Sequence, residues 1–292
     1  MPRSLFIETP SNFSFRHTIQ SHGWYDLAPF ALDEEKLTLS YVFCLPKTEP
    51  FRATISEASN GISIEYSSAK VDKKELAAAI KHILRLDDDL TGFYDLIEKG
   101  TGLDWVTSAK AGRLLRSPTV FEDLVKTICT TNCSWALTRK MVSNLVEKLG
   151  SDASNGSRSF PTAEAMASMS ADFYREEIKA GYRSPYFVEL TQAVAAGKLD
   201  PESWLSSELP TAELKKEMKK VKGVGDYAAE NLLKLVGRYD GLALDSFLRS
   251  EFYKKHNKEK ACPDKKIARH YKKFGDWKGL AIWCDMTEDW FA

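Results

Sequence analysis

The stretch Leu214–Asp245, LKKEMKKVKGVGDYAAENLLKLVGRYDGLALD, decides the fold of this chain. Apolar residues recur at helical spacing before its glycine pair, at Leu214, Met218 and Val221. They recur in the same way after the pair, at Ala228, Ala229, Leu232, Leu233 and Val236. This periodicity predicts a helix, a tight hairpin and a second helix that ends near Gly237.

The hairpin carries the features of a phosphate-binding turn. Gly223 and Gly225 flank Val224, and glycine allows both a left-handed backbone and the close approach of another molecule. The free N–H groups at the start of the second helix would attract an anion. Three lysines lie nearby, Lys219, Lys220 and Lys222. An ordinary helical hairpin whose glycines only permit the turn stays open on these residues alone.

A carboxylate follows the second helix after a short apolar run. Leu242, Ala243 and Leu244 lead to Asp245, which stands before the next predicted helix. We interpret Asp245 as a catalytic acid or base, because an unpaired carboxylate beside a phosphate-binding turn would otherwise repel the ligand. The alternative is that Asp245 caps the helix that starts at Ser246.

Composition and charge restrict the class of protein. The chain has 292 residues, 43% of them hydrophobic, which excludes a mainly disordered protein. Its five cysteines form no metal-binding pairs, so neither a zinc nor an iron–sulfur site is predicted. We see no leader and no apolar run of roughly 20 residues, and expect an intracellular protein without a membrane partner. In a bacterium we would expect the protein in the cytoplasm or nucleoid, and in a eukaryote in the nucleus.

The net charge is zero, but the charge is unevenly distributed. Between Glu213 and Lys278 there are 18 Lys or Arg against 10 Asp or Glu, so the rest of the chain is acidic. Such a segment can present a basic face to nucleic acid. A solvated, lysine-rich surface explains the same distribution equally well.

The predicted fold class is α+β, with an antiparallel sheet first and helices after it. Runs such as Leu37–Phe43 and Gly61–Tyr66 are typical of strands. From about Lys73 onward the periodic segments are helical. Ser117 is expected to cap one of these helices, with Pro118 in its first turn.

Two further polar segments interrupt the helices. The turn Thr130–Ser134 separates two apolar stripes and contains Asn132. In the second segment, Tyr182 would wedge between stacked bases and Arg183 would pair with a base edge or a phosphate. Each segment alone is also explained as a polar turn or a helix end.

These segments, in this order, resemble the helix-hairpin-helix DNA glycosylases of base excision repair. ICTTNCSW, GYRSPY and VKGVGDYAAENLLKL with LALDSFLRSEF carry the resemblance, which covers roughly residues 110–292. It places the chain between the alkyladenine and 8-oxoguanine branches, and implies that Asn132 fills the vacated base stack. It also implies a K⁺ or Na⁺ ion on the carbonyls of Lys219, Val221 and Val224, and no other cofactor.

The same resemblance implies a sheet domain followed by a two-lobed helical core. We divide the chain into a β-rich domain at 1–75, a lobe at 76–117 and 237–292 that carries Asp245, and a lobe at 118–236 that contains the hairpin. The sheet domain is compatible with the additional domain of both branches. We expect a monomer that acts on double-stranded DNA containing a damaged base.

The chain departs from the family pattern two residues beyond Gly225. Bifunctional members carry a lysine there that attacks the sugar, whereas this chain has Tyr227. Without that amine, hydrolysis by water with Asp245 is expected, which is monofunctional chemistry without strand cleavage. Lys222 is a second departure, because the family usually has proline at that position.

A flipped base needs a pocket, for which the sequence offers four residues. They are Tyr227, Asn231, Asp285 and Met286. An aromatic residue at position 227 is similar to the tryptophan with which alkylpurine enzymes hold electron-poor bases. Alkylated purines are therefore the favoured substrate and oxidised purines the second. The competing interpretation is a helix-hairpin-helix protein that binds DNA without catalysis.

Overall fold

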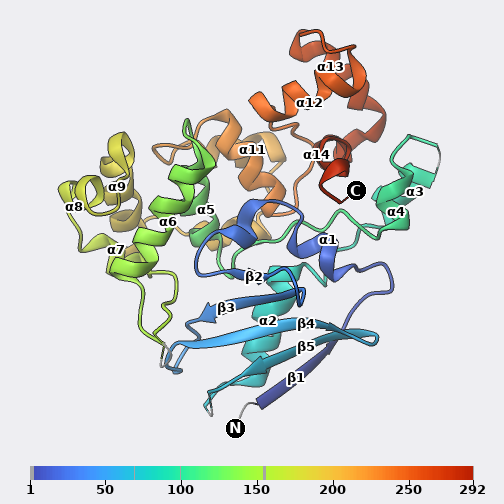
Figure 1. Cartoon of the computed structure of the whole chain (residues 1–292). Helices are drawn as coiled ribbons and strands as arrows, with labels where there is room; N and C mark the ends of the chain where they lie inside the picture. Colours follow the sequence, from blue (N-terminus) through green and yellow to red (C-terminus); the bar gives the residue numbers. More distant parts are fainter. Residues whose placement is uncertain (1–2, 69, 99, 154–155, 292) are drawn as a thin grey trace.

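A five-stranded antiparallel sheet forms the amino-terminal part of the computed structural model (Figure 1). The structure describes residues 3–68, 70–98, 100–153 and 156–291. The strand order is β1-β5-β4-β3-β2. The strands are β1 (Arg3–Glu8), β2 (Ala31–Asp33), β3 (Thr38–Phe43), β4 (Phe51–Ala58) and β5 (Gly61–Tyr66). The predicted α+β class, with its sheet at the amino terminus, is confirmed.

Helices make up most of the remaining chain. The first group is α1 (Phe15–Ile19), η1 (Gly23–Asp26), α2 (Lys73–Leu84), α3 (Thr91–Glu98), α4 (Asp104–Ser108), α5 (Val120–Thr130), α6 (Trp135–Leu149), α7 (Ala163–Ala167), α8 (Ala171–Glu176) and η2 (Gly181–Arg183). The second group is α9 (Ser184–Ala195), η3 (Pro201–Ser206), α10 (Thr211–Met218), α11 (Asp226–Leu235), α12 (Ser246–His256), α13 (Asp264–Tyr271), η4 (Lys272–Trp277), α14 (Lys278–Thr287) and η5 (Glu288–Phe291). Among the described residues, no helix combines the length and apolar character that a membrane span needs.

The sheet is explained by alternation along its central strands. Phe51, Ala53 and Ile55 of β4 are buried, while the residues between them are more exposed. A two-residue turn joins β4 to β5, with Asn60 at φ +61°, a left-handed conformation that asparagine tolerates well. One face of the sheet carries α2 (Figure 1).

Two separate groups of buried apolar residues form the interior. The first joins the sheet and α2 to helices α5 to α11, and the second joins α3 and α4 to α12, α13 and α14. Leu76 and Ile80 of α2 belong to the first group. Helix α2 thus belongs to the same buried group as the sheet, whereas α3 and α4 belong to the second group.

The start of α5 differs from the prediction. Thr119 caps this helix by accepting a hydrogen bond from the Glu122 N–H, whereas Ser117 lies two residues earlier. Ser117 is fully buried and its own N–H donates to Asp123 at 2.9 Å. Ser117 therefore takes part in a buried polar contact. The helix is capped instead by Thr119, the next residue with a hydroxyl group.

The carboxyl end of α11 is bound by two arginines from distant parts of the chain. Arg85, 1% exposed, donates to the carbonyls of Lys234 and Leu235 at 3.1 Å each. Arg116 donates to the Leu235 carbonyl at 3.2 Å. Asp88 holds the Arg85 guanidinium through a 2.7 Å contact. These cations satisfy carbonyls that have no partner within the helix and oppose the negative end of its dipole.

We expect Arg85→Met to lower the free energy of unfolding by about 3 kcal/mol, because the substitution removes the 2.7 Å ion pair of the half-buried Asp88 and two charged hydrogen bonds to the end of α11. Lys81→Met, in the last turn of the helix that Arg85 follows, is the matched control. Lys81 pairs with Asp87 at 3.6 Å on the surface, and its loss is expected to cost below about 0.5 kcal/mol. Urea denaturation of both variants measures the difference, and equal small effects would contradict the role of Arg85.

Candidate active site

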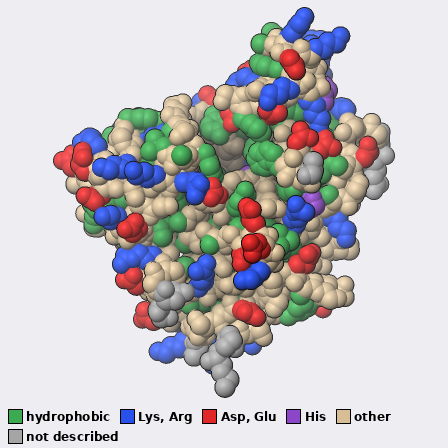
Figure 2. Space-filling view, viewed as in Figure 1, with side chains coloured by type: hydrophobic (Ala, Val, Ile, Leu, Met, Phe, Trp, Pro, Cys, Tyr) green, Lys and Arg blue, Asp and Glu red, His purple; other side chains and the backbone are tan. Residues whose placement is uncertain are grey.

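A cleft of about 930 Å³ lies where the two buried groups meet. Figure 2 shows the surface hollowed there, with hydrophobic side chains around the opening. Most of its lining comes from five parts of the chain: the segment 22–25, the end of α5 with the start of α6 and the turn between them, one face of α11, the residues around the start of α12, and two carboxy-terminal tryptophans. The main polar lining residues are His22, Asn132, Tyr227, Asn231, Lys234 and Asp245.

Asp245 faces this cleft and also caps α12. One of its carboxylate oxygens accepts a hydrogen bond from the Leu248 N–H at 2.7 Å. The residue is half-buried and lines the cleft. The structure thus shows Asp245 as a helix cap, and the cap orients the carboxylate without removing it from the cleft.

The loop that carries Asp245 is attached to the hairpin helices. Lys215 of α10 contacts the Glu230 carboxylate at 2.6 Å. Glu230 of α11 in turn accepts the N–H of Ala243, which has a left-handed φ of +51°. This connection fixes the position of Asp245 relative to the hairpin, since Ala243 lies only two residues before it.

Tyr227 lies beside Asp245 at the amino end of α11. Burial, the negative charge of Asp245 and a hydrogen bond to that carboxylate raise the pKa of the Tyr227 phenol to about 12. The side chain is therefore neutral at pH 7 and offers a hydroxyl donor and an aromatic face. Asn231 lines the cleft one turn further along α11, and its amide nitrogen donates to the Tyr227 carbonyl at 2.9 Å.

Lys234 is a cleft residue that the sequence analysis missed. It is 2% exposed, and its ammonium lies 5.5 Å from the ring centroid of Trp283. Burial lowers the pKa of Lys234 to about 8, although the negative charges of Glu230 and Asp245 oppose this shift. Its spacing of seven residues from Tyr227 places both on one helix face, which is the signal that would have found it.

The amino-terminal domain also contributes to the cleft. Trp24 lines it and donates its indole N–H to Asp123 at 2.6 Å. Trp283 also lines the cleft and donates to the Ser21 carbonyl at 2.9 Å. His22 lies close to both rings, and burial lowers its pKa to about 4, so the imidazole is neutral. The sequence did not predict that these residues line a site, because isolated aromatic residues in an irregular segment form no periodic pattern.

The turn between α5 and α6 places Asn132 at the cleft. Asn132 is exposed and adopts a left-handed φ of +47°. Arg183 supports this turn by donating to the carbonyls of Ile128, at 3.1 Å, and Thr131. With 3% exposure and these partners, the guanidinium is not free to meet a base or a phosphate, which corrects our prediction for Arg183. Tyr182 beside it is 51% exposed.

Asp285 and Met286 lie outside the cleft lining, which corrects their assignment to the base pocket. Met286 is 5% exposed and packs in the second buried group. The Asp285 carboxylate contacts Tyr271 at 2.6 Å, His256 at 2.7 Å and Lys255 at 2.9 Å. Burial alone would raise the pKa of Asp285, but the hydrogen bonds from Tyr271 and Lys255 hold it below its usual value. Asp285 thus joins α12, α13 and α14.

One group of side chains in the described ranges has metal-ligand chemistry. The ligand atoms of His256, His270 and Asp285 lie within 4.8 Å of one another. A metal would have to displace the ammonium of Lys255 and the hydroxyl of Tyr271 from the carboxylate. The group is therefore explained by the packing of the three helices.

The two hairpin glycines answer different requirements. Gly223 has φ +91°, and a Cβ there would lie 2.9 Å from Tyr186, so the fold itself needs glycine. Gly225 has φ −86°, a conformation open to any residue, and a Cβ there would meet no atom within 4 Å. Gly225 is the N-cap residue of α11, a position where glycine is common, and its backbone is open to the approach of another molecule.

The hairpin backbone and its lysines have partners in the structure. The Val224 N–H donates to the Val221 carbonyl at 3.0 Å and closes the turn. Lys222 pairs with Glu189 at 2.5 Å on the surface. Lysines 219 and 220 likewise contact carboxylates. On the face in Figure 2, positive and negative side chains are interspersed. A bound phosphate would have to replace these carboxylates as the partner of the lysines.

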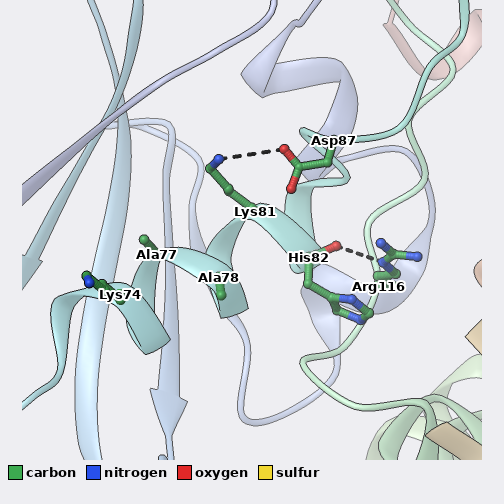
Figure 3. Close-up of a pocket in the computed structure, with 7 residues that line it drawn as sticks. All are labelled: Lys74, Ala77, Ala78, Lys81, His82, Asp87 and Arg116. Carbon is green, nitrogen blue, oxygen red and sulfur yellow. Dashed lines mark hydrogen bonds and ion pairs between the residues drawn. The ribbon is translucent and has the colours of Figure 1, made fainter.

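A second hollow of about 510 Å³ lies over α2 (Figure 3). Its Lys81 lies 3.6 Å from Asp87, and Arg116 donates to the His82 carbonyl at 2.7 Å. Burial and the charge of Arg116 lower the pKa of His82 to about 3. Lys81 and Arg116 have partners and the imidazole of His82 is neutral, so we place the candidate active site in the larger cleft.

The fold is that of DNA glycosylases of known structure. A 3-methyladenine DNA glycosylase from Archaeoglobus fulgidus superposes with a TM-score of 0.79 and 18% identity, over 99% of each chain. An 8-oxoguanine glycosylase/lyase from Clostridium acetobutylicum gives 0.75 and 18%, over 97% of this chain and 95% of that chain. A 3-methyladenine DNA glycosylase from Schizosaccharomyces pombe, in complex with abasic DNA, gives 0.51 and 19%, over 74% and 98%. No family model and no curated sequence matches the chain. The predicted helix-hairpin-helix glycosylase fold is confirmed.

Proposed function

We propose that this protein is a monofunctional DNA glycosylase, which hydrolyses the N-glycosidic bond of a flipped damaged base and leaves an abasic site. The observation that carries the proposal is the Asp245 carboxylate, which faces an aromatic cleft after the helix α11 that follows the glycine hairpin. We further propose that the protein acts as a monomer on double-stranded DNA.

The chemistry needs a carboxylate at this place. Breaking the N-glycosidic bond develops positive charge on the sugar, as in other glycoside hydrolysis. An ionised Asp245 would stabilise that charge and orient the attacking water. Tyr227 would donate a hydrogen bond to the carboxylate and present its ring to the nucleotide. Because the phenol stays protonated well above pH 7, it offers no nucleophile at neutral pH.

DNA would bind along the hairpin and the neighbouring turn. A phosphate can approach the open backbone at Gly225 and the amino end of α11. Asn132 and the exposed Tyr182 lie where they can enter a base stack that has lost its flipped base. The carbonyls of Lys219 and Val221, with that of Val224, would hold a K⁺ or Na⁺ ion in the turn.

A flipped base would be held between aromatic rings. Trp24, Tyr227 and Trp283 line the cleft and supply faces for stacking. Aromatic walls suit the electron-poor rings of alkylated purines, which we place first, and they accept oxidised purines as well.

A non-catalytic helix-hairpin-helix protein is the second candidate. The paired lysines and the open glycine fit a protein that only binds DNA. Such a protein has no use for a carboxylate aimed into a deep cleft, because Asp245 would repel the phosphates. Excision measurements therefore separate the two candidates.

We expect Asp245→Asn to keep the fold and DNA binding but to reduce base excision by at least about 100-fold, because it removes the charge that stabilises the sugar cation. Asparagine also caps helices, so α12 keeps its amino end. Asp264→Asn removes one charge outside the cleft and is the control. Alkaline cleavage of lesion-containing duplexes reports excision, and undiminished turnover by Asp245→Asn would rule the residue out.

Gly225→Ala is expected to weaken binding to every duplex sequence severalfold, since the methyl group would stand where a phosphate approaches. Its stability should stay within about 0.5 kcal/mol of wild type, as surface substitutions usually do. Gly223→Ala, in contrast, should lose about 1–2 kcal/mol of stability from the left-handed backbone. Fluorescence anisotropy at several salt concentrations gives the affinity, which should fall with salt. A salt-independent affinity would contradict phosphate binding.

Borohydride trapping tests the monofunctional assignment. We expect no covalent complex with damaged DNA and strand breakage only after alkali, since Tyr227 cannot form a Schiff base. Among the described residues that line the cleft, Lys234 carries the one amine. If a trapped complex forms with the wild type and not with Lys234→Met, an amine attacks and the hydrolytic assignment is wrong.

A further inference from the structure

Lys234 is a buried cation in the cleft whose binding capacity is largely unused. An ammonium has three N–H donors. The single protein acceptor of Lys234 in the described structure is the Leu242 carbonyl, at a long 3.4 Å. No carboxylate of a described residue lies within 4.0 Å of it. A buried charge with so few partners is costly to the fold, which indicates a role toward a ligand.

We propose that Lys234 selects the base: it favours neutral damaged bases that present a keto oxygen or a ring nitrogen to it, and disfavours bases with a fixed positive charge. The inference rests on the proposed function and narrows its substrate class.

The position of Lys234 along α11 places it at the level of a base. DNA is expected at the amino end of this helix, and Tyr227 in its first turn stands beside Asp245. Asn231 and Lys234 follow on the same face, about 6 and 10 Å further along the helix axis. A nucleotide with its sugar at Asp245 would therefore extend its base toward Lys234, whose side chain leans back toward the amino end.

The charge of Lys234 decides which base fits. Its pKa, although lowered to about 8, still lies above 7, so the charged ammonium predominates at pH 7. A keto oxygen or ring nitrogen would accept a charge-assisted hydrogen bond from it. A purine methylated at N3 or N7 carries a positive charge into the same low-dielectric space, where two cations repel strongly.

This repulsion opposes the attraction of the aromatic walls for cations. A full charge acts over a longer range than a ring quadrupole, and the Trp283 ring already faces the Lys234 ammonium. Among alkylated purines we therefore expect only neutral ones, such as ethenoadenine, to be good substrates. Oxidised or deaminated purines, which are also neutral, become better candidates.

Excision from four duplexes tests the proposal, each with one lesion: 7-methylguanine as the cationic base, and ethenoadenine, hypoxanthine or 8-oxoguanine as neutral bases. Wild type should excise at least one neutral base about tenfold faster than 7-methylguanine. Lys234→Met should slow the excision of that neutral base about tenfold, and should raise the rate of 7-methylguanine excision relative to it. Methionine removes a buried charge at similar volume, so the variant is expected to fold.

The outcomes separate the inference from the function. A wild-type preference for 7-methylguanine, or an equal effect of Lys234→Met on all lesions, overturns the role of Lys234 and leaves the glycosylase proposal intact. If the wild type excises none of the four bases, the proposed function and this inference fail together. Urea denaturation confirms folding, and Lys234→Gln replaces the methionine variant if the latter does not fold.

Discussion

The carboxyl end of α11 depends on the buried arginines Arg85 and Arg116, and much of the site depends on α11. Their guanidinium groups bind carbonyls in its last turn, which fixes the helix between the sheet domain and the second buried group. The amino end of the same helix carries the glycine hairpin, and its side carries Tyr227 and Lys234. Because one rigid element holds all three features, their relative positions vary little.

Asp245 lies outside α11 but is tied to it. The Glu230 carboxylate binds both the Lys215 ammonium and the backbone N–H of Ala243, so the loop before Asp245 cannot move independently of the hairpin. This arrangement fixes the distance between the expected phosphate contact and the carboxylate. A fixed distance matters, since catalysis by a charge depends on its position before the reaction begins.

The sequence predicted the features that local patterns determine. Periodicity located α10 and α11, alternation located β3 and β5, and the order of motifs predicted the fold that the structural comparisons confirm. Contacts between distant segments could not be predicted. The Lys234 ammonium lies near the ring of Trp283, Arg183 donates to a turn some fifty residues earlier, and Asp285 links three helices. Residue type and spacing do not specify such partners.

The buried cations of this chain differ in how fully they are bound. Arg85 and Arg183 bind carbonyls at helix ends, and Lys126 lies 2.6 Å from Glu122. Each therefore has a partner that accounts for its burial. Lys234 shares their burial but has one long hydrogen bond and faces the cleft. A charge that the fold leaves incompletely bound, at a place a ligand can reach, is better explained by the ligand than by the fold.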